Sequence, residues 1–198
     1  MSVEKWSCFT KRAASVSMVQ VEAIVLFVCI GNFPDEPWYP SNVLVRCVSF
    51  EDSNDILKWR NDSLSIGMSV TQERVSEEQH ATWFPTTINS SECVHLIGEL
   101  VASDQKPHKV GVCRFDRTKS HEWRVSINMN PAFRGKGLSE KLLSHSVLFW
   151  VNHIDARNVI LVAEIKKKNA ASFRIFERNG FEPADSSADV IEMIRKLH

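Results

Sequence analysis

A glycine-rich loop between a predicted strand and a predicted helix constrains this chain more than any other segment. Residues 125–129 alternate between apolar and polar side chains, and Pro131 ends the alternation. The loop Arg134-Gly-Lys-Gly-Leu-Ser139 leads directly into an amphipathic pattern. Its two glycines allow backbone N–H groups to turn toward one point at the positive end of the helix. The segment therefore predicts an anion site, and a ligand that carries phosphate is the first hypothesis.

Two common nucleotide-binding loops do not fit this segment. The chain contains no G-x-x-x-x-G-K-[ST], which disfavours a P-loop NTPase. It also lacks a G-x-G-x-x-G followed by an acidic residue about twenty positions later, which argues against a dinucleotide fold. Two glycines can also stand in a strand-to-helix turn for steric reasons alone, so the loop needs support from the rest of the chain.

Composition narrows the class of protein. A length of 198 residues suits one α/β domain with a sizeable core. Lys plus Arg and Asp plus Glu are 24 each, and this balance disfavours a nucleic-acid partner. The five cysteines are scattered without C-x-x-C spacing, and the histidines show no metal-ligand spacing. We therefore expect a reducing, cytoplasmic location, no disulfide framework and no metal.

Residues 1–42 are predicted to form an N-terminal extension of uncertain role. Its apolar run, residues 23–30, follows several basic residues but is too short to span a bilayer. No small-x-small cleavage site follows the run, so we expect a buried strand or extension and no membrane association. The prolines within residues 32–41 indicate a linker, and the main domain is predicted at residues 43–198.

The main domain shows an α/β order of predicted elements. Strands are predicted at 43–48, 94–100, 109–115, 122–129, 159–165 and within 190–194, and helices at 54–61, from Ser76 onward, at 138–150 and at 170–178. Ser76 and Gln79 form a capping box at the start of the second helix. The strand at 159–165 is nearly all apolar, which is typical of a strand buried on both faces.

Two segments resemble the GNAT acetyltransferases. The loop is similar to the acyl-CoA loop of that family, [RQ]-x-x-G-x-[GA], with Arg134 and Gly137 in place and Ser139 instead of Gly or Ala. Residues 168–181 are similar to the family segment N-x-x-(A/S)-x-x-x-(Y/F)-x-x-x-G-F. The chain is identified as a member of this family. The resemblance implies an α/β GNAT fold, with a mixed, mostly antiparallel central sheet flanked by helices and splayed fourth and fifth strands.

The resemblance also implies acetyl-CoA as the cosubstrate and assigns residues to it. Loop N–H groups would hold the pyrophosphate, the end of the preceding strand would face the thioester, and Asn169 would bind the pantetheine arm. The implied set is Ile127, Met129, Arg134, Gly135, Lys136, Gly137, Leu138, Ser139, Asn169, Ser172 and Phe176. Phe176 stands where many members carry a tyrosine that protonates the leaving sulfur. Either another group or solvent does so here, or the thiolate leaves unprotonated.

Acetylation of an amine needs a group that accepts the proton of the amine. Strand alternation places Glu122, Arg124 and Ser126 on one face. Glu122 is the first candidate for the base, directly or through water, and Ser126 is a second catalytic candidate. A solvated ion pair with Arg124 is the alternative for Glu122.

The acceptor is suggested by a narrower resemblance. Trp59-Arg-Asn-Asp62, Glu78-Gln-His80 and residues 111–116 are similar to the amino-sugar N-acetyltransferases of pseudaminic acid pathways, and ribosomal-protein acetyltransferases share some of these features. This similarity implies a nucleotide-linked 4-amino sugar, with Trp59, Arg60, Asn61, His80 and Trp83 on the acceptor side. Trp59 as a core residue and His80 as a structural residue are the alternatives.

Two other functions stay open at this point. One is acetylation of a protein N-terminus, an antibiotic or a polyamine. The other is binding of acyl-CoA without catalysis, suggested by Phe176, Ser139 and the N-terminal extension. The expected partner is a small amine, and a homodimer is left open.

Overall fold

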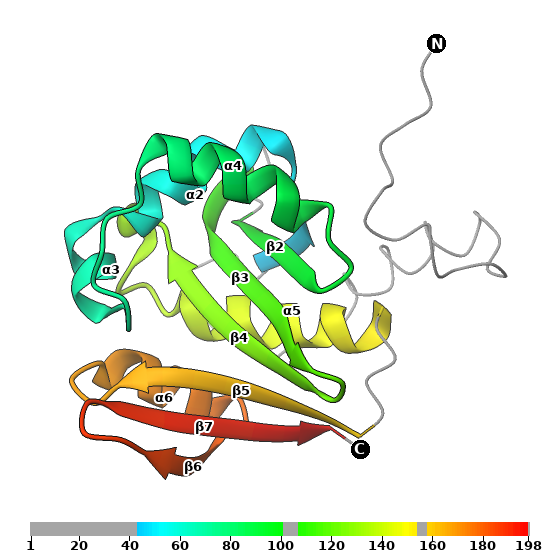
Figure 1. The fold of residues 1–198 in the computed structure, drawn as a ribbon, viewed down its shortest axis with the longest axis vertical. Coiled ribbons are helices and arrows are strands. Elements are labelled where there is room, and N and C mark those ends of the chain that lie inside the picture. Colours follow the sequence, from blue (N-terminus) through cyan, green and yellow to red (C-terminus); the bar gives the residue numbers. More distant parts are fainter. Residues whose placement is uncertain (1–42, 101–106, 154–157, 198) are drawn as a thin grey trace, which may run out of the picture. The chain divides into compact units, whose positions relative to one another are not determined.

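A computed structural model describes residues 43–100, 107–153 and 158–197, which form one seven-stranded sheet with helices packed on its two faces (Figure 1). The predicted extension and linker, residues 1–42, lie outside the described residues. Within the described part of the chain, no helix is long and apolar enough to cross a membrane.

The strands follow the spatial order β1-β2-β3-β4-β5-β7-β6. Their bounds are Val43–Cys47 for β1, Cys93–Leu100 for β2, His108–Lys119 for β3, Glu122–Met129 for β4, Val159–Lys166 for β5, Glu182–Ser186 for β6 and Val190–Leu197 for β7. All neighbours are antiparallel except β4 and β5, which run parallel. The sheet is therefore mixed and mostly antiparallel, as predicted.

The parallel strands β4 and β5 pair at only one end. Their register joins Glu122 to Ile160, Trp123 to Leu161 and Arg124 to Val162, and it stops there. Beyond Arg124, β4 keeps its partner β3 as far as Met129, but among the described residues no strand pairs with its other side. Figure 1 shows β4 and β5 moving apart toward their arrowheads. The predicted splay is confirmed, and it leaves one edge of β4 open.

The helices pack on both faces of the sheet. They are η1 (Phe50–Asp52), α2 (Ser53–Arg60), α3 (Ser63–Met68), α4 (Glu77–Ile88), η2 (Pro131–Phe133), α5 (Leu138–His153) and α6 (Ala170–Arg178). The main core cluster joins α5 and α6 to the sheet through residues such as Leu142, Trp150 and Phe176. A second cluster joins α2 and α4 to the other face. The predicted capping box at Ser76 and Gln79 is present at the start of α4.

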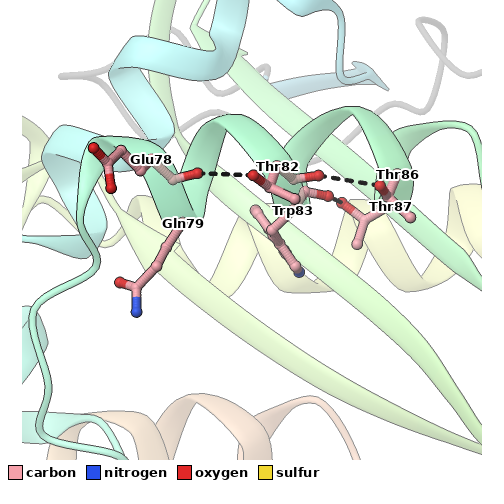
Figure 2. A pocket seen from close by; sticks show the side chains of 6 residues that line it. All are labelled: Glu78, Gln79, Thr82, Trp83, Thr86 and Thr87. Atoms are coloured by element: carbon pink, nitrogen blue, oxygen red, sulfur yellow. Dashed lines mark hydrogen bonds between the residues drawn. The ribbon is translucent and has the colours of Figure 1, made fainter.

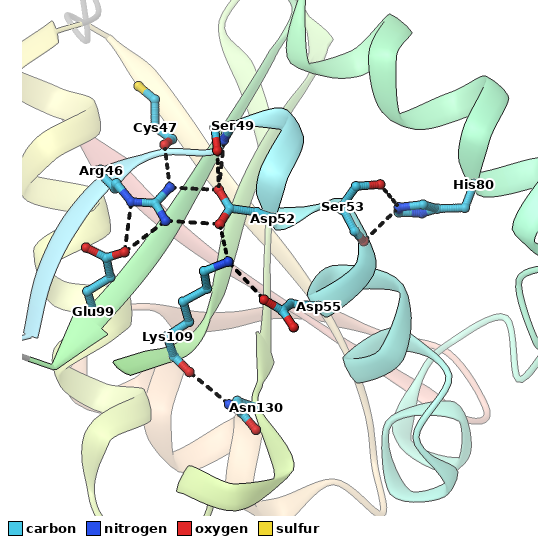
Figure 3. A network of polar contacts seen from close by, with 10 residues as sticks. All are labelled: Arg46, Cys47, Ser49, Asp52, Ser53, Asp55, His80, Glu99, Lys109 and Asn130. Atoms are coloured by element: carbon cyan, nitrogen blue, oxygen red, sulfur yellow. Dashed lines mark hydrogen bonds and ion pairs between the residues drawn. The ribbon is translucent and has the colours of Figure 1, made fainter. Parts of the chain in front are cut away.

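A buried carboxylate fixes α2 to the sheet (Figure 3). Asp52 is 0% exposed and accepts hydrogen bonds from the Arg46 guanidinium at 2.7 and 3.0 Å. Lys109 of β3 lies 2.8 Å from the same carboxylate and 2.9 Å from Asp55. Burial alone would raise the pKa of Asp52, but Arg46 and Lys109 hold that pKa well below its ordinary value. Asp52 of η1 thus joins β1 to β3, and Lys109 extends the network to Asp55 of α2.

The sequence prediction missed helix α3, strand β6 and the short 3-10 helices η1 and η2, and it made β3 too short. The six-residue helix α3 is too short for an apolar period, although Asp62 caps it by accepting from the N–H groups of Leu64 and Ser65. Strand β6, Glu182–Ser186, is exposed throughout and so carries no alternation of apolar residues. Strand β3 continues to Lys119, so the segment 116–121 is mostly strand and only its end is a turn.

Candidate functional site

The glycine loop lies where β4 ends, beside the open edge of the sheet. Gly135 and Gly137 have φ values of 72° and 70°, in the left-handed region that favours glycine. A Cβ atom built on either residue would meet nothing within 4 Å. The space beside both glycines is therefore open, and left-handed residues of this kind occur in backbone anion cradles.

Helix α5 begins directly after the loop and is held firmly by the core. Leu138 and Leu142 are buried in the main cluster, while Ser139 is only partly buried. A sixteen-residue helix anchored in this way directs the positive end of its dipole at the loop. The side chain of Leu138 belongs to the core, so only its main chain can contribute to an anion site.

Arg134 belongs to the set of residues implied for acetyl-CoA, and its side chain contacts α3. Its Nη1 lies 2.6 Å from Asp62, and its Nη2 donates to Ser65 Oγ at 2.8 Å. Ser65 in turn donates to Asn128 of β4 at 3.0 Å. The hydrogen bond from Arg134 holds the pKa of Asp62 below its ordinary value. These contacts tie the glycine loop, α3 and the open end of β4 to one another.

Lys136 is the exposed cation of the loop. Its Nζ lies 5.0 Å from the centre of the Phe133 ring, within the range of a cation–π contact. Ile127 and Met129 lie nearby on β4, in the stretch where that strand pairs only with β3. Their main chain thus borders the opening between β4 and β5.

Across the opening, β5 leads into α6. Asn169 caps α6 by accepting a hydrogen bond from the Ser172 N–H at 3.1 Å, so the structure brings these two predicted residues together. Phe176 is 3% exposed and packs edge-on against Phe181, with ring centres 4.9 Å apart. Its ring is thus part of the core of the domain.

Glu122 lies at the closed end of β4, opposite Ile160, and the structure does not bring it together with the glycine loop. Its carboxylate accepts a hydrogen bond from Thr118 Oγ1 at 2.7 Å and pairs with Lys119 at 2.9 Å. These contacts hold the pKa of Glu122 below its ordinary value, which weakens it as a base. Ser126 lies farther along β4 in an exposed position opposite Arg114.

A carboxylate that the sequence analysis missed borders the opening. Glu164 lies on β5 two residues beyond Val162, the last position that pairs with β4. Its carboxylate is an exposed ion-pair partner of Arg124, at 3.2 Å. The signal in the sequence is that Glu164 is the single charged residue within the otherwise apolar run 159–165.

Four of the five predicted acceptor residues make contacts within the domain. Trp59 is 5% exposed and packs in the second core cluster. His80 Nε2 contacts the backbone and hydroxyl oxygens of Ser53, and burial lowers the pKa of this ring. Asn61 donates to and accepts from the backbone of Val75. Arg60 Nη2 donates to Thr71 Oγ1 at 3.2 Å.

Trp83, the fifth, lines a shallow surface hollow of about 550 Å³ on α4 (Figure 2). The hollow is lined by Glu78, Gln79, Thr82, Trp83, Thr86 and Thr87. The guanidinium carbon of Arg114 lies 4.9 Å from the centre of the Trp83 ring, and the His95 ring lies 5.5 Å from it. The half-buried indole thus has a cation on one of its faces.

The open parallel pair and the glycine loop at the start of α5 are the features that the GNAT fold requires. Residues 42–182, well over half of the chain, match the family model described as an acetyltransferase (GNAT) domain. The chain therefore belongs to the GNAT family of acetyltransferases, which makes it an N-acetyltransferase by class.

Solved structures show the same fold. A domain from Methanocaldococcus jannaschii superposes with a TM-score of 0.68 at 20% identity, over 79% of this chain and 99% of that chain. Spermidine N-acetyltransferase from Vibrio cholerae, in complex with CoA and spermine, has a TM-score of 0.67 at 15% identity, over 79% and 96%. An aminoglycoside acetyltransferase in complex with coenzyme A and kanamycin has a TM-score of 0.63 at 16% identity, over 78% and 95%. A comparison with curated protein sequences gives no match.

Proposed function

We propose that this protein is an acetyl-CoA-dependent N-acetyltransferase that acts on a small primary amine. The observation that carries the proposal is the opening between β4 and β5, which ends at a glycine loop with open space before its backbone. Family membership gives the class of reaction, and the two enzymes compared above are in complex with coenzyme A.

The residues around the opening fit acetyl-CoA. The N–H groups of residues 135–139 and the dipole of α5 suit a pyrophosphate, with Lys136 as the nearby cation. Main-chain groups of Ile127 and Met129 suit the amides of a pantetheine arm, because that edge of β4 has no strand beside it within the described residues. Ser172 and the capped end of α6 border the other side. Acetyl-CoA, when bound, supplies a thioester carbonyl that an unprotonated amine attacks.

Glu164 replaces Glu122 as our candidate for the group that accepts the proton of the amine. It lies on the splayed part of β5, whereas Glu122 lies at the closed end of β4 and already pairs with Lys119. Arg124 pairs with Glu164 at 3.2 Å and would orient its carboxylate. Phe176 carries no hydroxyl, so that position donates no proton to the leaving group.

The favoured acceptor is a nucleotide-linked amino sugar. A half-buried indole offers a flat surface for a base, and Trp83 is such a residue, with the Arg114 guanidinium 4.9 Å from the centre of its ring. Such a substrate and the thiol usage of the chain fit a cytoplasmic enzyme.

A polyamine or another polycationic amine is the second candidate. Glu164 of β5, Glu192 of β7 and Asp185 of β6 stand opposite one another in the register of the sheet. Like charges in such cross-strand positions repel one another, and a cationic substrate would relieve the repulsion.

The test is a turnover assay that follows release of the CoA thiol, with a nucleotide-linked 4-amino sugar, spermine and a peptide with a free N-terminus as acceptors. Trp83→Ala should raise KM for the nucleotide sugar and leave KM for spermine unchanged, and Glu77→Gln, on the same helix but outside the lining of the hollow, is the control. Glu164→Gln should lower kcat for every acceptor, whereas Glu122→Gln should change it little. Acetyl-CoA binding without turnover of any amine would instead favour a non-catalytic module.

A further inference from the structure

A cluster of three metal-ligating side chains lies on the α4 side of the sheet, outside the acetyl-transfer site. Cys93 and His95 are two residues apart on β2, so they project from the same face of the sheet. Asp116 of β3 stands directly opposite Cys93 in the strand register. Three adjacent positions of two paired strands therefore carry a thiol, an imidazole and a carboxylate.

The spacing of their ligand atoms is close to what a metal ion needs. One ligand atom from each residue lies within 4.8 Å of the others, and Cys93 Sγ lies 3.2 Å from Asp116 Oδ1. Zinc bond lengths of about 2.0–2.3 Å put tetrahedral ligand atoms roughly 3.3–3.8 Å apart. Small side-chain rotations would therefore bring all three onto one ion.

His95 points independently to a ligand. The residue is 5% exposed, and its Nε2 is buried without a hydrogen-bond partner among the described residues. A buried polar atom without a partner is unfavourable unless something binds it. An imidazole with a free ring nitrogen is the commonest side-chain ligand of metals.

Arg114 brings a positive charge to the cluster. Its Nε and Nη2 lie 2.7 and 2.6 Å from Asp116 Oδ1, and the Cys93 thiol donates to that same oxygen. Among the described residues, no group donates to Oδ2, which leaves this oxygen for a metal. A thiolate and a carboxylate together neutralise a divalent ion, and Arg114 then orients the carboxylate as an outer partner.

We propose that Cys93, His95 and Asp116 bind a divalent transition metal of the zinc class, with one coordination position left for solvent. A thiolate, a neutral imidazole and a carboxylate form the borderline-soft set that zinc accepts. The site lies beside Trp83, and its existence does not depend on the proposed acceptor. The sequence does not reveal this site, because Asp116 lies on β3, far in sequence from Cys93 and His95 on β2.

Titration of the full-length protein with Co²⁺ tests the proposal, because cobalt reports its ligands by absorption. One equivalent should produce a thiolate-to-cobalt charge-transfer band together with the intense visible bands of four-coordinate cobalt. Added Zn²⁺ should displace the cobalt and abolish both. Absence of a thiolate band in the folded, reduced protein would overturn the assignment.

Variants locate the site. Cys93→Ser should remove the thiolate band, and His95→Gln should weaken cobalt binding by roughly tenfold or more, since even outer-shell changes cost about this much. Cys47→Ser, and the pair Cys8→Ser and Cys29→Ser, are controls that should keep the band. Circular dichroism establishes that each variant is folded. A band that survives in folded Cys93→Ser would contradict the proposal.

Discussion

Replacement of Asp52 by asparagine should destabilise the fold more than any other single charge removal around α2. The substitution keeps the shape of the side chain but removes a fully buried charge that contacts Arg46 and Lys109. Removing one partner of a buried ion pair typically costs about 3–5 kcal/mol, because the other charge is left uncompensated. Here both cations keep a second carboxylate, Glu99 for Arg46 and Asp55 for Lys109. Arg46 and Lys109 are also partly exposed, so we expect the free energy of unfolding to fall by about 2–3 kcal/mol.

The difference in free energy of unfolding between wild type and Asp52→Asn should become smaller in acid. The pKa of Asp52 in the folded protein is well below its ordinary value of 3.8. A carboxyl group whose pKa is depressed on folding contributes stability above the unfolded pKa, and that stability is lost as the pH falls through the folded pKa. The difference between wild type and Asp52→Asn should therefore be constant near neutral pH. It should shrink as the pH is lowered below 3.8.

Urea denaturation followed by circular dichroism measures both effects. Asp55→Asn is the matched control, because it removes a neighbouring carboxylate that contacts Lys109 but is 39% exposed. The free energy of unfolding should fall by less than about 1 kcal/mol in the control, as is usual for exposed pairs. Equal losses in the two variants, or a difference that does not narrow in acid, would refute the role assigned to Asp52.

Other predictions concern the loop, α3 and α6. In thermal melts Gly137→Ala should cost about 1 kcal/mol, because its φ is 70°, while Gly67→Ala should stabilise α3 by about 0.5–1 kcal/mol. Both added methyl groups meet open space, so a loss at both positions would contradict the backbone argument. Asp62→Asn removes the charge that pairs with Arg134 but keeps the cap of α3. In a double-mutant cycle measured by urea denaturation, Asp62→Asn and Arg134→Met should show a coupling free energy near 1 kcal/mol, and strictly additive losses of stability would contradict the pair. Asn169→Ala should lower the free energy of unfolding by about 1 kcal/mol through loss of the α6 cap, and Ser172→Ala is the control.

Features set by neighbouring residues could be predicted from the sequence. The capping box at Ser76 depends on a side chain three residues away, and the left-handed loop depends on glycines at two close positions. The splay of β4 and β5 came instead from the resemblance to the family, because no local pattern encodes it. The splay is confirmed by a register that stops at Arg124.

Side-chain partners from distant segments could not be predicted. Arg134 was assigned to the acetyl-CoA site from the loop pattern alone, because its partner Asp62 is 72 residues away in the sequence. Trp59 was predicted on the acceptor side with the core as the alternative, and its packing in one cluster with Phe84 of α4 could not be seen in the sequence. Glu122 was favoured because strand alternation predicts the face on which a side chain lies. It does not predict where β4 and β5 separate, and Glu122 lies in the paired stretch whereas Glu164 lies beyond it.

Calorimetric titration of the protein with acetyl-CoA tests whether the glycine loop binds the cosubstrate, with Gly137→Glu as the decisive variant and Gly67→Glu as its control. We expect one site of micromolar affinity in the wild type and in Gly67→Glu. We expect no binding in folded Gly137→Glu, where a negative side chain enters the open space before the loop. Unchanged affinity in Gly137→Glu, or no binding by the wild type, would contradict the assignment of the loop.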